Sequence, residues 1–149
     1  MEKIRSIKSK KGGGGTFFAI AIILIVIVLG VWGINKYLKN RRQTLLEEFQ
    51  GKLQEDVNDL KNSTRGWKQP TYGLPKNFTQ VCFKNREQDN LILKSNTGSI
   101  MEKVEHVDLA NITKGTEDNE FCVEVVDGDV EMVLEKKEDN PKVIIKRVD

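Results

Sequence analysis

An uncharged, apolar run near the N-terminus constrains this chain more than any other feature of its sequence. Residues 17–34 read FFAIAIILIVIVLGVWGI, and no charged side chain occurs from residue 12 to residue 35. As an α-helix this run extends about 27 Å, close to the bilayer hydrocarbon thickness of about 30 Å. A segment in lipid must satisfy its own backbone hydrogen bonds, which a single helix does. We therefore predict a transmembrane helix over residues 13–37.

Two other interpretations of this run fit the sequence less well. A buried core helix of a soluble protein is seldom so long, so free of charge and bracketed by basic clusters. A cleaved secretory signal has a shorter apolar region, of about 7 to 15 residues, and here bulky Trp32 lies between the small residues Gly30 and Gly33. Trp32 and Tyr37 lie near one end of the run, where we expect them to anchor the helix at the headgroup level of a lipid bilayer.

Charge is distributed unevenly along the chain. Residues 1–11 hold five basic side chains and one acidic one, and residues 36–42 add four basic ones. From residue 43 onward there are 15 basic and 21 acidic side chains. A nucleic-acid-binding domain would concentrate basic charge on its folded part, so this class of function is not expected. The two basic clusters are better explained as contacts to lipid headgroups.

The orientation of the helix must come from features other than flanking charge, because both flanks are equally basic. Cys82 and Cys122 are the only cysteines, and paired cysteines in a small domain favour an oxidising compartment. Asn62, Asn77 and Asn111 each begin an Asn-X-Ser/Thr glycosylation sequon. We therefore predict a cell-membrane protein with a cytoplasmic N-terminus and an extracytoplasmic C-terminal domain.

The helical pattern continues beyond the membrane segment as an amphipathic stem over residues 38–64. Apolar side chains recur there at spacings of three, four and seven, with charged residues between them. They are Leu38, Leu45, Leu46, Phe49, Leu53, Val57 and Leu60. This stripe needs a partner, and the sequence leaves two equally open: the chain's own β domain, or a neighbouring copy in an oligomer or filament.

Short β-rich runs separated by turn residues follow the stem. We expect a linker over residues 65–77, which contains two prolines, and an extracytoplasmic β domain over residues 78–149. About five strands are expected, over residues 78–84, 91–94, 120–126, 130–136 and 143–148. Asp127-Gly128 between alternating hydrophobic residues predicts a hairpin, so the last three strands should form an antiparallel meander. The expected fold class is α+β, a long N-terminal transmembrane and stem helix followed by a small antiparallel sheet or sandwich.

We predict a disulfide between Cys82 and Cys122. Closing a loop of about 40 residues is worth about 4 kcal/mol in the chain-entropy model. So small a domain gains noticeably from such a bond. Two buried free thiols are the alternative, since unpaired cysteines are common in protein cores.

No residue pattern in the chain indicates catalysis. His106 is the only histidine, so zinc ligation or acid–base chemistry lacks a second histidine. The acidic groups of residues 117–120 and 127–129 do not match an EF-hand spacing. The glycine run of residues 12–15 follows no strand and precedes no Gly-Lys-Ser. We therefore expect no enzyme activity, no metal, no cofactor and no small-molecule substrate.

The N-terminus resembles the class III signal peptide of type IV pilins and related archaeal pilin-like proteins. Lys10, Lys11 and Gly12 are followed directly by a hydrophobic segment. In that family a membrane peptidase cuts after the glycine of a basic cytoplasmic leader, and the freed helix packs in a filament core. The resemblance implies a leader over residues 1–12, cleavage after Gly12 and a β-rich head outside the cell. Many pilins have glutamate at the fifth mature position, where this chain has Phe17.

Three classes of function follow. The first is a pilin-like structural or assembly protein of the cell surface, which self-associates through its apolar helix and has a freed N-terminus. The second is a single-pass anchored binding module or accessory subunit of an envelope complex, which keeps its leader and grips a protein partner. The third is a cytoplasmic-facing domain on a helix of reverse orientation, with reduced cysteines and unmodified sequons.

Overall fold

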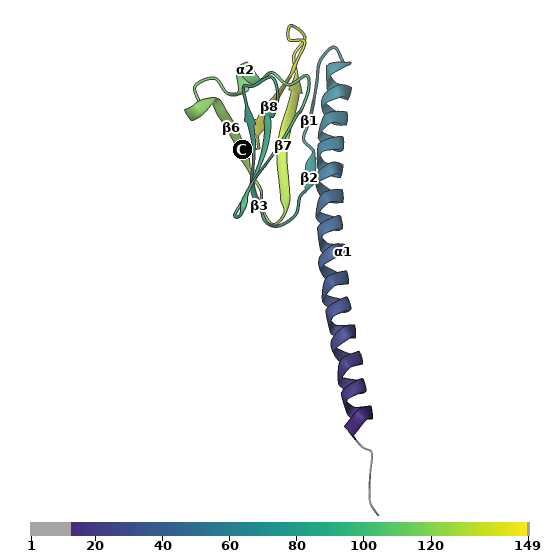
Figure 1. The fold of residues 1–149 in the computed structure, drawn as a ribbon. Coiled ribbons are helices and arrows are strands. Elements are labelled where there is room, and N and C mark those ends of the chain that lie inside the picture. The colour runs from purple at the N-terminus through teal and green to yellow at the C-terminus, as the bar shows by residue number, and fades with distance from the viewer. Residues whose placement is uncertain (1–12, 149) are drawn as a thin grey trace, which may run out of the picture. The chain divides into compact units, whose positions relative to one another are not determined.

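The computed structural model describes residues 13–148, and the predicted leader lies outside this range. A long helix, α1 (Gly13–Lys61), is followed by eight strands in the described part of the chain (Figure 1). The chain divides into two compact units, Met1–Arg41 and Arg42–Asp149. The second unit, which we call the head, contains the C-terminal part of α1 and every strand.

The strands of the head form two antiparallel sheets. The β7 sheet has β7 (Asp129–Lys136) paired with β1 (Gly66–Lys68), β2 (Thr71–Gly73) and β8 (Val143–Arg147). The β3 sheet has the order β5-β4-β3-β6, with β3 (Phe78–Lys84), β4 (Leu91–Ser95), β5 (Gly98–Glu102) and β6 (Glu120–Glu124). A short helix α2 (Leu109–Ile112) and a 3-10 turn η1 (Glu117–Asn119) connect β5 to β6. The predicted α+β class is confirmed.

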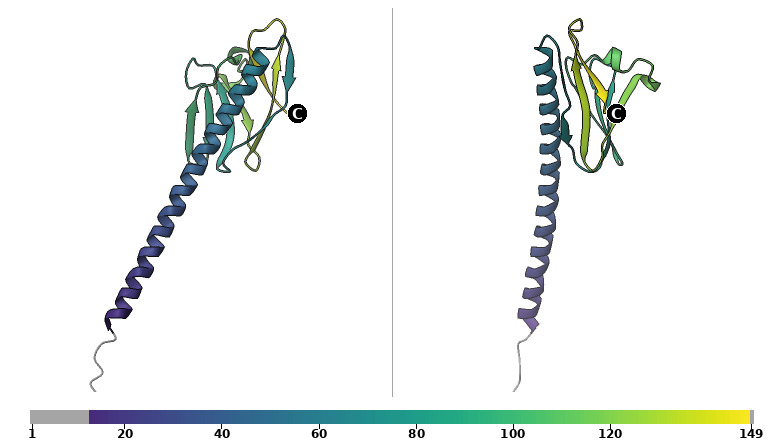
Figure 2. Two further views of the ribbon diagram at one scale, coloured as in Figure 1. Left: turned by 90° about the vertical axis from the view of Figure 1, so that its right-hand side faces the viewer. Right: turned by 180° about the vertical axis from the view of Figure 1, so that it is seen from behind.

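The C-terminal part of α1 completes the core of the head. Phe49, Leu53, Val57 and Leu60 are buried in one cluster with the inward side chains of both sheets. Seen from the helix side, strands flank this part of α1 on either side (Figure 2, left). The stem stripe is therefore used within the chain, and the first of its two predicted partners is the observed one.

Hydrogen bonds tie the same part of α1 to both margins of the sandwich. On one side, Gln50 and Gln54 donate to the carbonyls of Lys103 and Glu105, just after β5. On the other side, Lys68 of β1 and Tyr72 of β2 bond to the Asp56 carboxylate. The helix thus bridges the two sheets. The glutamines on one side of its buried stripe bond to the edge of the β3 sheet, and Asp56 on the other side bonds to the β7 sheet.

The segment of residues 65–77, predicted as a linker, is part of the β7 sheet. β1 and β2 pair with the two halves of β7. One proline lies between these two strands and the other follows the end of β2. Pro70 and Pro75 fall outside both strands, which is where a residue without a backbone N–H is tolerated. The strands were missed because runs of three residues are too short to give a periodic signal.

The predicted meander of the last three strands is wrong at its first connection. The hairpin turn exists, with Asp127 and Gly128 both at positive φ and a bridge between Val126 and Asp129. Beyond that bridge the strands diverge, because β6 pairs with β3 and β7 pairs with β8. β6 belongs to the β3 sheet and β7 to the β7 sheet, so the turn at Asp127 and Gly128 connects the two sheets.

Candidate functional site

The N-terminal part of α1 is an exposed apolar surface. The large apolar side chains from Phe17 to Leu38 are 45–77% exposed. The described part of the chain has one helix long and apolar enough to cross a membrane, with a mean hydropathy of 3.0 in its most apolar window. Trp32 and Tyr37 are 63% and 65% exposed, and the Lys36 ammonium lies 5.2 Å from the centre of the Trp32 ring. This segment is the predicted membrane anchor, and none of the described residues of its own unit covers it.

A polar cluster lies at the edge of the core between α1 and the β7 sheet. The Tyr72 hydroxyl donates to Asp56 at 2.9 Å, and the Lys68 ammonium bonds Asp56 at 2.9 Å and Asp59 at 3.0 Å. Burial, followed by the hydrogen bond to Asp56, raises the pKa of Tyr72 well above its usual value. Hydrogen bonds to the two carboxylates raise the pKa of Lys68. These contacts fix the C-terminal part of α1 against the β7 sheet.

The two cysteines form the predicted disulfide. Cys82 of β3 and Cys122 of β6 are direct partners in the strand register, with a Cα–Cα distance of 4.0 Å. Cys82 is buried, whereas Cys122 is partly exposed. Among the described residues these cysteines and Glu120 form one group with the spacing of metal ligands. The two sulfurs are bonded to each other and Glu120 pairs with Lys94 at 3.0 Å, so the group has no thiolate to offer a metal.

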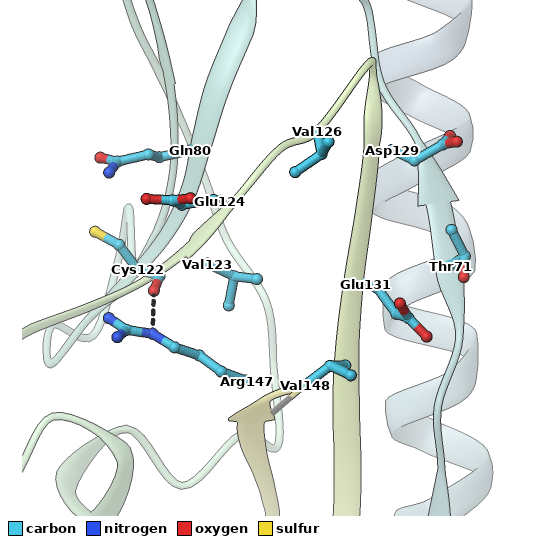
Figure 3. A pocket seen from close by; sticks show the side chains of 10 residues that line it. All are labelled: Thr71, Gln80, Cys122, Val123, Glu124, Val126, Asp129, Glu131, Arg147 and Val148. Atoms are coloured by element: carbon cyan, nitrogen blue, oxygen red, sulfur yellow. Dashed lines mark hydrogen bonds between the residues drawn. The ribbon is translucent and has the colours of Figure 1, made fainter.

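A hollow of about 690 Å³ opens where β6 and β7 diverge (Figure 3). We call it the acidic hollow, because three carboxylates and one guanidinium are among its lining side chains. Its lining residues are Thr71, Gln80, Cys122, Val123, Glu124, Val126, Asp129, Glu131, Arg147 and Val148. The valines lie between Glu124 on one side and Asp129 and Glu131 on the other (Figure 3). Arg147 is held by its Nε, which donates to the Cys122 carbonyl at 2.8 Å.

A second surface of opposite charge lies at the other end of β7. We call it the basic patch, because four basic and two acidic side chains line it around the indole of Trp67. Its residues are Arg65, Gly66, Trp67, Val133, Glu135, Lys136, Lys137, Glu138 and Lys146. Trp67 is 69% exposed. Lys146 holds Glu135 in an ion pair at 2.5 Å, and this hydrogen bond lowers the pKa of Glu135.

The remaining predicted site residues lie apart from these two surfaces. Asn62 and Asn111 are exposed and Asn77 is half-buried, so the three sequons do not form one site. His106 is half-buried and its Nε2 lies 3.1 Å from the Lys61 ammonium at the end of α1. The histidine therefore packs against the stem. Gly12, the predicted cleavage site, lies outside the described residues.

Sequence reasoning missed both the acidic hollow and the basic patch. A signal was present in the run from Asp129 to Lys137, where alternate residues share one face of the strand. That face carries Asp129, Glu131 and Glu135 within β7, and Lys137 follows the strand, so the sequence signalled the acidic hollow more clearly than the basic patch. The contribution of Trp67 could not be read from the sequence, because β1 was expected to be linker.

No protein-family model matches the chain, and no curated protein or solved structure matches it either.

Proposed function

We propose that this chain is a membrane-anchored, pilin-like structural or assembly subunit that displays a small β domain at the cell surface. The observation that supports the proposal is that the two parts of α1 differ in what covers their apolar side chains. Its N-terminal part is apolar and exposed from Phe17 to Ile34, whereas Phe49, Leu53, Val57 and Leu60 supply core side chains to the head. One part of the helix is therefore left for lipid or for neighbouring helices, and the other part fixes the head.

The proposed orientation places the N-terminus in the cytoplasm and the head outside. The Cys82–Cys122 disulfide supports this side, because disulfides persist in oxidising compartments. The exposed positions of Asn62 and Asn111 are compatible with modification there. A membrane-impermeant lysine reagent applied to intact cells should label residues beyond position 43. Labelling of these residues only after lysis would favour the reverse orientation.

The deciding experiment is the N-terminal residue of the mature protein, measured by mass spectrometry on the membrane fraction. A start at Gly13, or within the glycine run of residues 13–15, is expected if the leader is cut as in pilins. Removal of the leader would also free the apolar helix for packing against other copies. An intact Met1, or loss of Met1 alone, would rule out the pilin-like function.

A single-pass anchored binding module or accessory subunit is the second candidate. Phe17, at the position where many pilins have glutamate, favours it, because the segment then carries no charge to direct packing between helices. An anchor that is apolar on all sides also suits lipid as its only neighbour. This candidate predicts a retained leader and a head that binds its partner as a monomer.

A further inference from the structure

The outward face of the β7 sheet is electrically polarised along β7. Val130, Met132 and Leu134 point into the core, so the alternate residues face outward. Asp129 and Glu131 lie at the acidic end, beside Glu124 of the acidic hollow. The basic patch, with Arg65, Lys137 and Lys146, lies at the other end. At about 3.3 Å per residue the two ends are separated by roughly 25 Å.

Each charged surface also exposes a large apolar side chain. Trp67 is 69% exposed in the basic patch, and Val126 is 66% exposed in the acidic hollow. Exposed aromatic side chains with polar surroundings are the usual anchors of protein interfaces. A contact that covers Trp67 with the valines of the hollow would bury apolar area and pair the charges around it.

We propose that the basic patch of one copy docks into the acidic hollow of the next, so that heads associate head to tail. The surfaces are complementary in sign, because the hollow has three carboxylates and one guanidinium, and the patch exposes the basic side chains of Arg65, Lys137 and Lys146 beside two carboxylates. Lys136 does not contribute to this charge, since it is buried and its ammonium donates to the Lys137 and Asn140 carbonyls. This inference rests on the proposed self-association of the chain and names the head surfaces that take part in it. Such a contact is heterologous, and it leaves a free hollow at one end of a growing row of copies and a free patch at the other end.

An antiparallel pair of heads would also match the two charged ends, because the patch of each copy then faces the hollow of the other. Head-to-tail contact instead uses one patch and one hollow at each junction, with the heads shifted along β7. The two arrangements therefore differ in size, since the antiparallel pair stops at two copies and the head-to-tail contact continues.

Photo-crosslinking of the full-length chain in its native membrane tests the contact. A copy with Trp67→p-benzoylphenylalanine should crosslink to residues 122–131 of another copy, and the products should form a ladder beyond the dimer.

Glu124→Lys and Lys137→Glu, both at exposed positions, should each lower the crosslinked fraction about fivefold or more through like-charge contact. The double variant should restore the fraction, because the two charges are exchanged. Raising the salt concentration should weaken the crosslink, since the paired charges lie at the surface.

Matched controls use charge reversals at exposed positions outside both surfaces. Glu87→Lys and Lys114→Glu should leave the crosslinked fraction unchanged. A product that stops at the dimer, a crosslink from position 67 to position 67, or failure of the double variant to restore the yield would each overturn the head-to-tail contact.

A second photo-crosslinker at Val26, in the apolar segment, separates this inference from the proposed function. Crosslinks between copies at position 26 without any from position 67 would retain self-association and overturn the head contact. Loss of crosslinks at both positions would overturn both.

Discussion

At the residue scale, Gly128 carries the tightest conformational demand in the described chain. It has φ +92°, and a Cβ at this position would lie 2.9 Å from the Leu74 carbonyl oxygen. Its own carbonyl accepts a hydrogen bond from the Leu74 N–H, so the turn is fixed against the end of β2. The glycine therefore serves both the turn that links the sheets and the close approach of the 74–76 segment.

Gly128→Ala should destabilise the head by about 1–3 kcal/mol, because it adds left-handed backbone strain to a backbone clash. The matched change Gly51→Ala, in the helix with open space around the added Cβ, should instead stabilise it by about 0.5–1 kcal/mol. Urea unfolding of the full chain in detergent, followed by tryptophan fluorescence, measures both. Equal effects of the two changes would contradict the argument.

Tyr72 should make the folding stability of the head fall as the pH rises into the alkaline range. Because its pKa is raised in the folded state, Tyr72 stays protonated there while the unfolded chain ionises above about pH 10. Its contribution to stability is thus fully present below pH 10 and is lost as the pH rises further. Lys68 acts in the same direction, since its pKa is also raised.

Tyr72→Phe should lower the stability at pH 8 by about 1–2 kcal/mol through loss of the hydrogen bond to Asp56. Between pH 9 and pH 11 the variant should lose less stability than the parent chain, because the linked ionisation is gone. Thermal unfolding across this pH range, followed by circular dichroism, checks the prediction. Parallel stability curves for the two proteins would show that Tyr72 is not the group that titrates.

At the scale of elements, α1 is one helix that serves two environments. Its C-terminal part is a core element, with Leu53 and Val57 fully buried. It closes the sandwich between the two sheets and supplies the carboxylates of the Asp56 cluster. The apolar stripe that a filament interface would need in this region is consequently already occupied.

Leu53→Ala should destabilise the head by about 2–5 kcal/mol, the range for a buried leucine truncated in a packed core. Leu38→Ala, at a position 45% exposed, should leave head unfolding unchanged. Urea denaturation of the two variants in the same detergent provides the comparison. A small effect of Leu53→Ala would mean that the stem does not contribute to the core of the head.

At the scale of the whole molecule, the apolar segment of α1 is long and apolar enough to anchor the protein in a membrane. Its central residues are apolar on all sides of the helix, and residues 23–29 are 54–65% exposed. Such a surface is stable when covered by lipid or by other helices. The proposed surface assembly needs both the anchor and the head.

Ile25→Arg should displace the chain from the membrane, because an arginine at the centre of a span costs about 2.5–3.5 kcal/mol on the insertion scale. The carbonate-resistant fraction of the protein should fall strongly, whereas Ile25→Ala should retain it. Membrane retention of the arginine variant at the parental level would contradict a spanning role for this segment.

The sequence by itself determined the features that depend on local pattern. The apolar run, the stem stripe, the Asp-Gly turn and the strand at residues 78–84 each follow from periodicity or turn chemistry within a short window. The pairing of Cys82 with Cys122 needed only the count of cysteines. The α+β order of elements follows from the same local signals.

Tertiary structure alone decided which elements meet. The pairing of β6 with β3, the addition of β1 and β2 to β7 and the burial of the stem in the head depend on long-range packing. The same packing brings Glu124 of β6 to Glu131 of β7, and Trp67 to Lys146 of β8. A strand carries hydrophobic alternation whichever neighbour it acquires, so its sequence does not specify that neighbour. The neighbour is selected by the joint burial of apolar faces across the whole core.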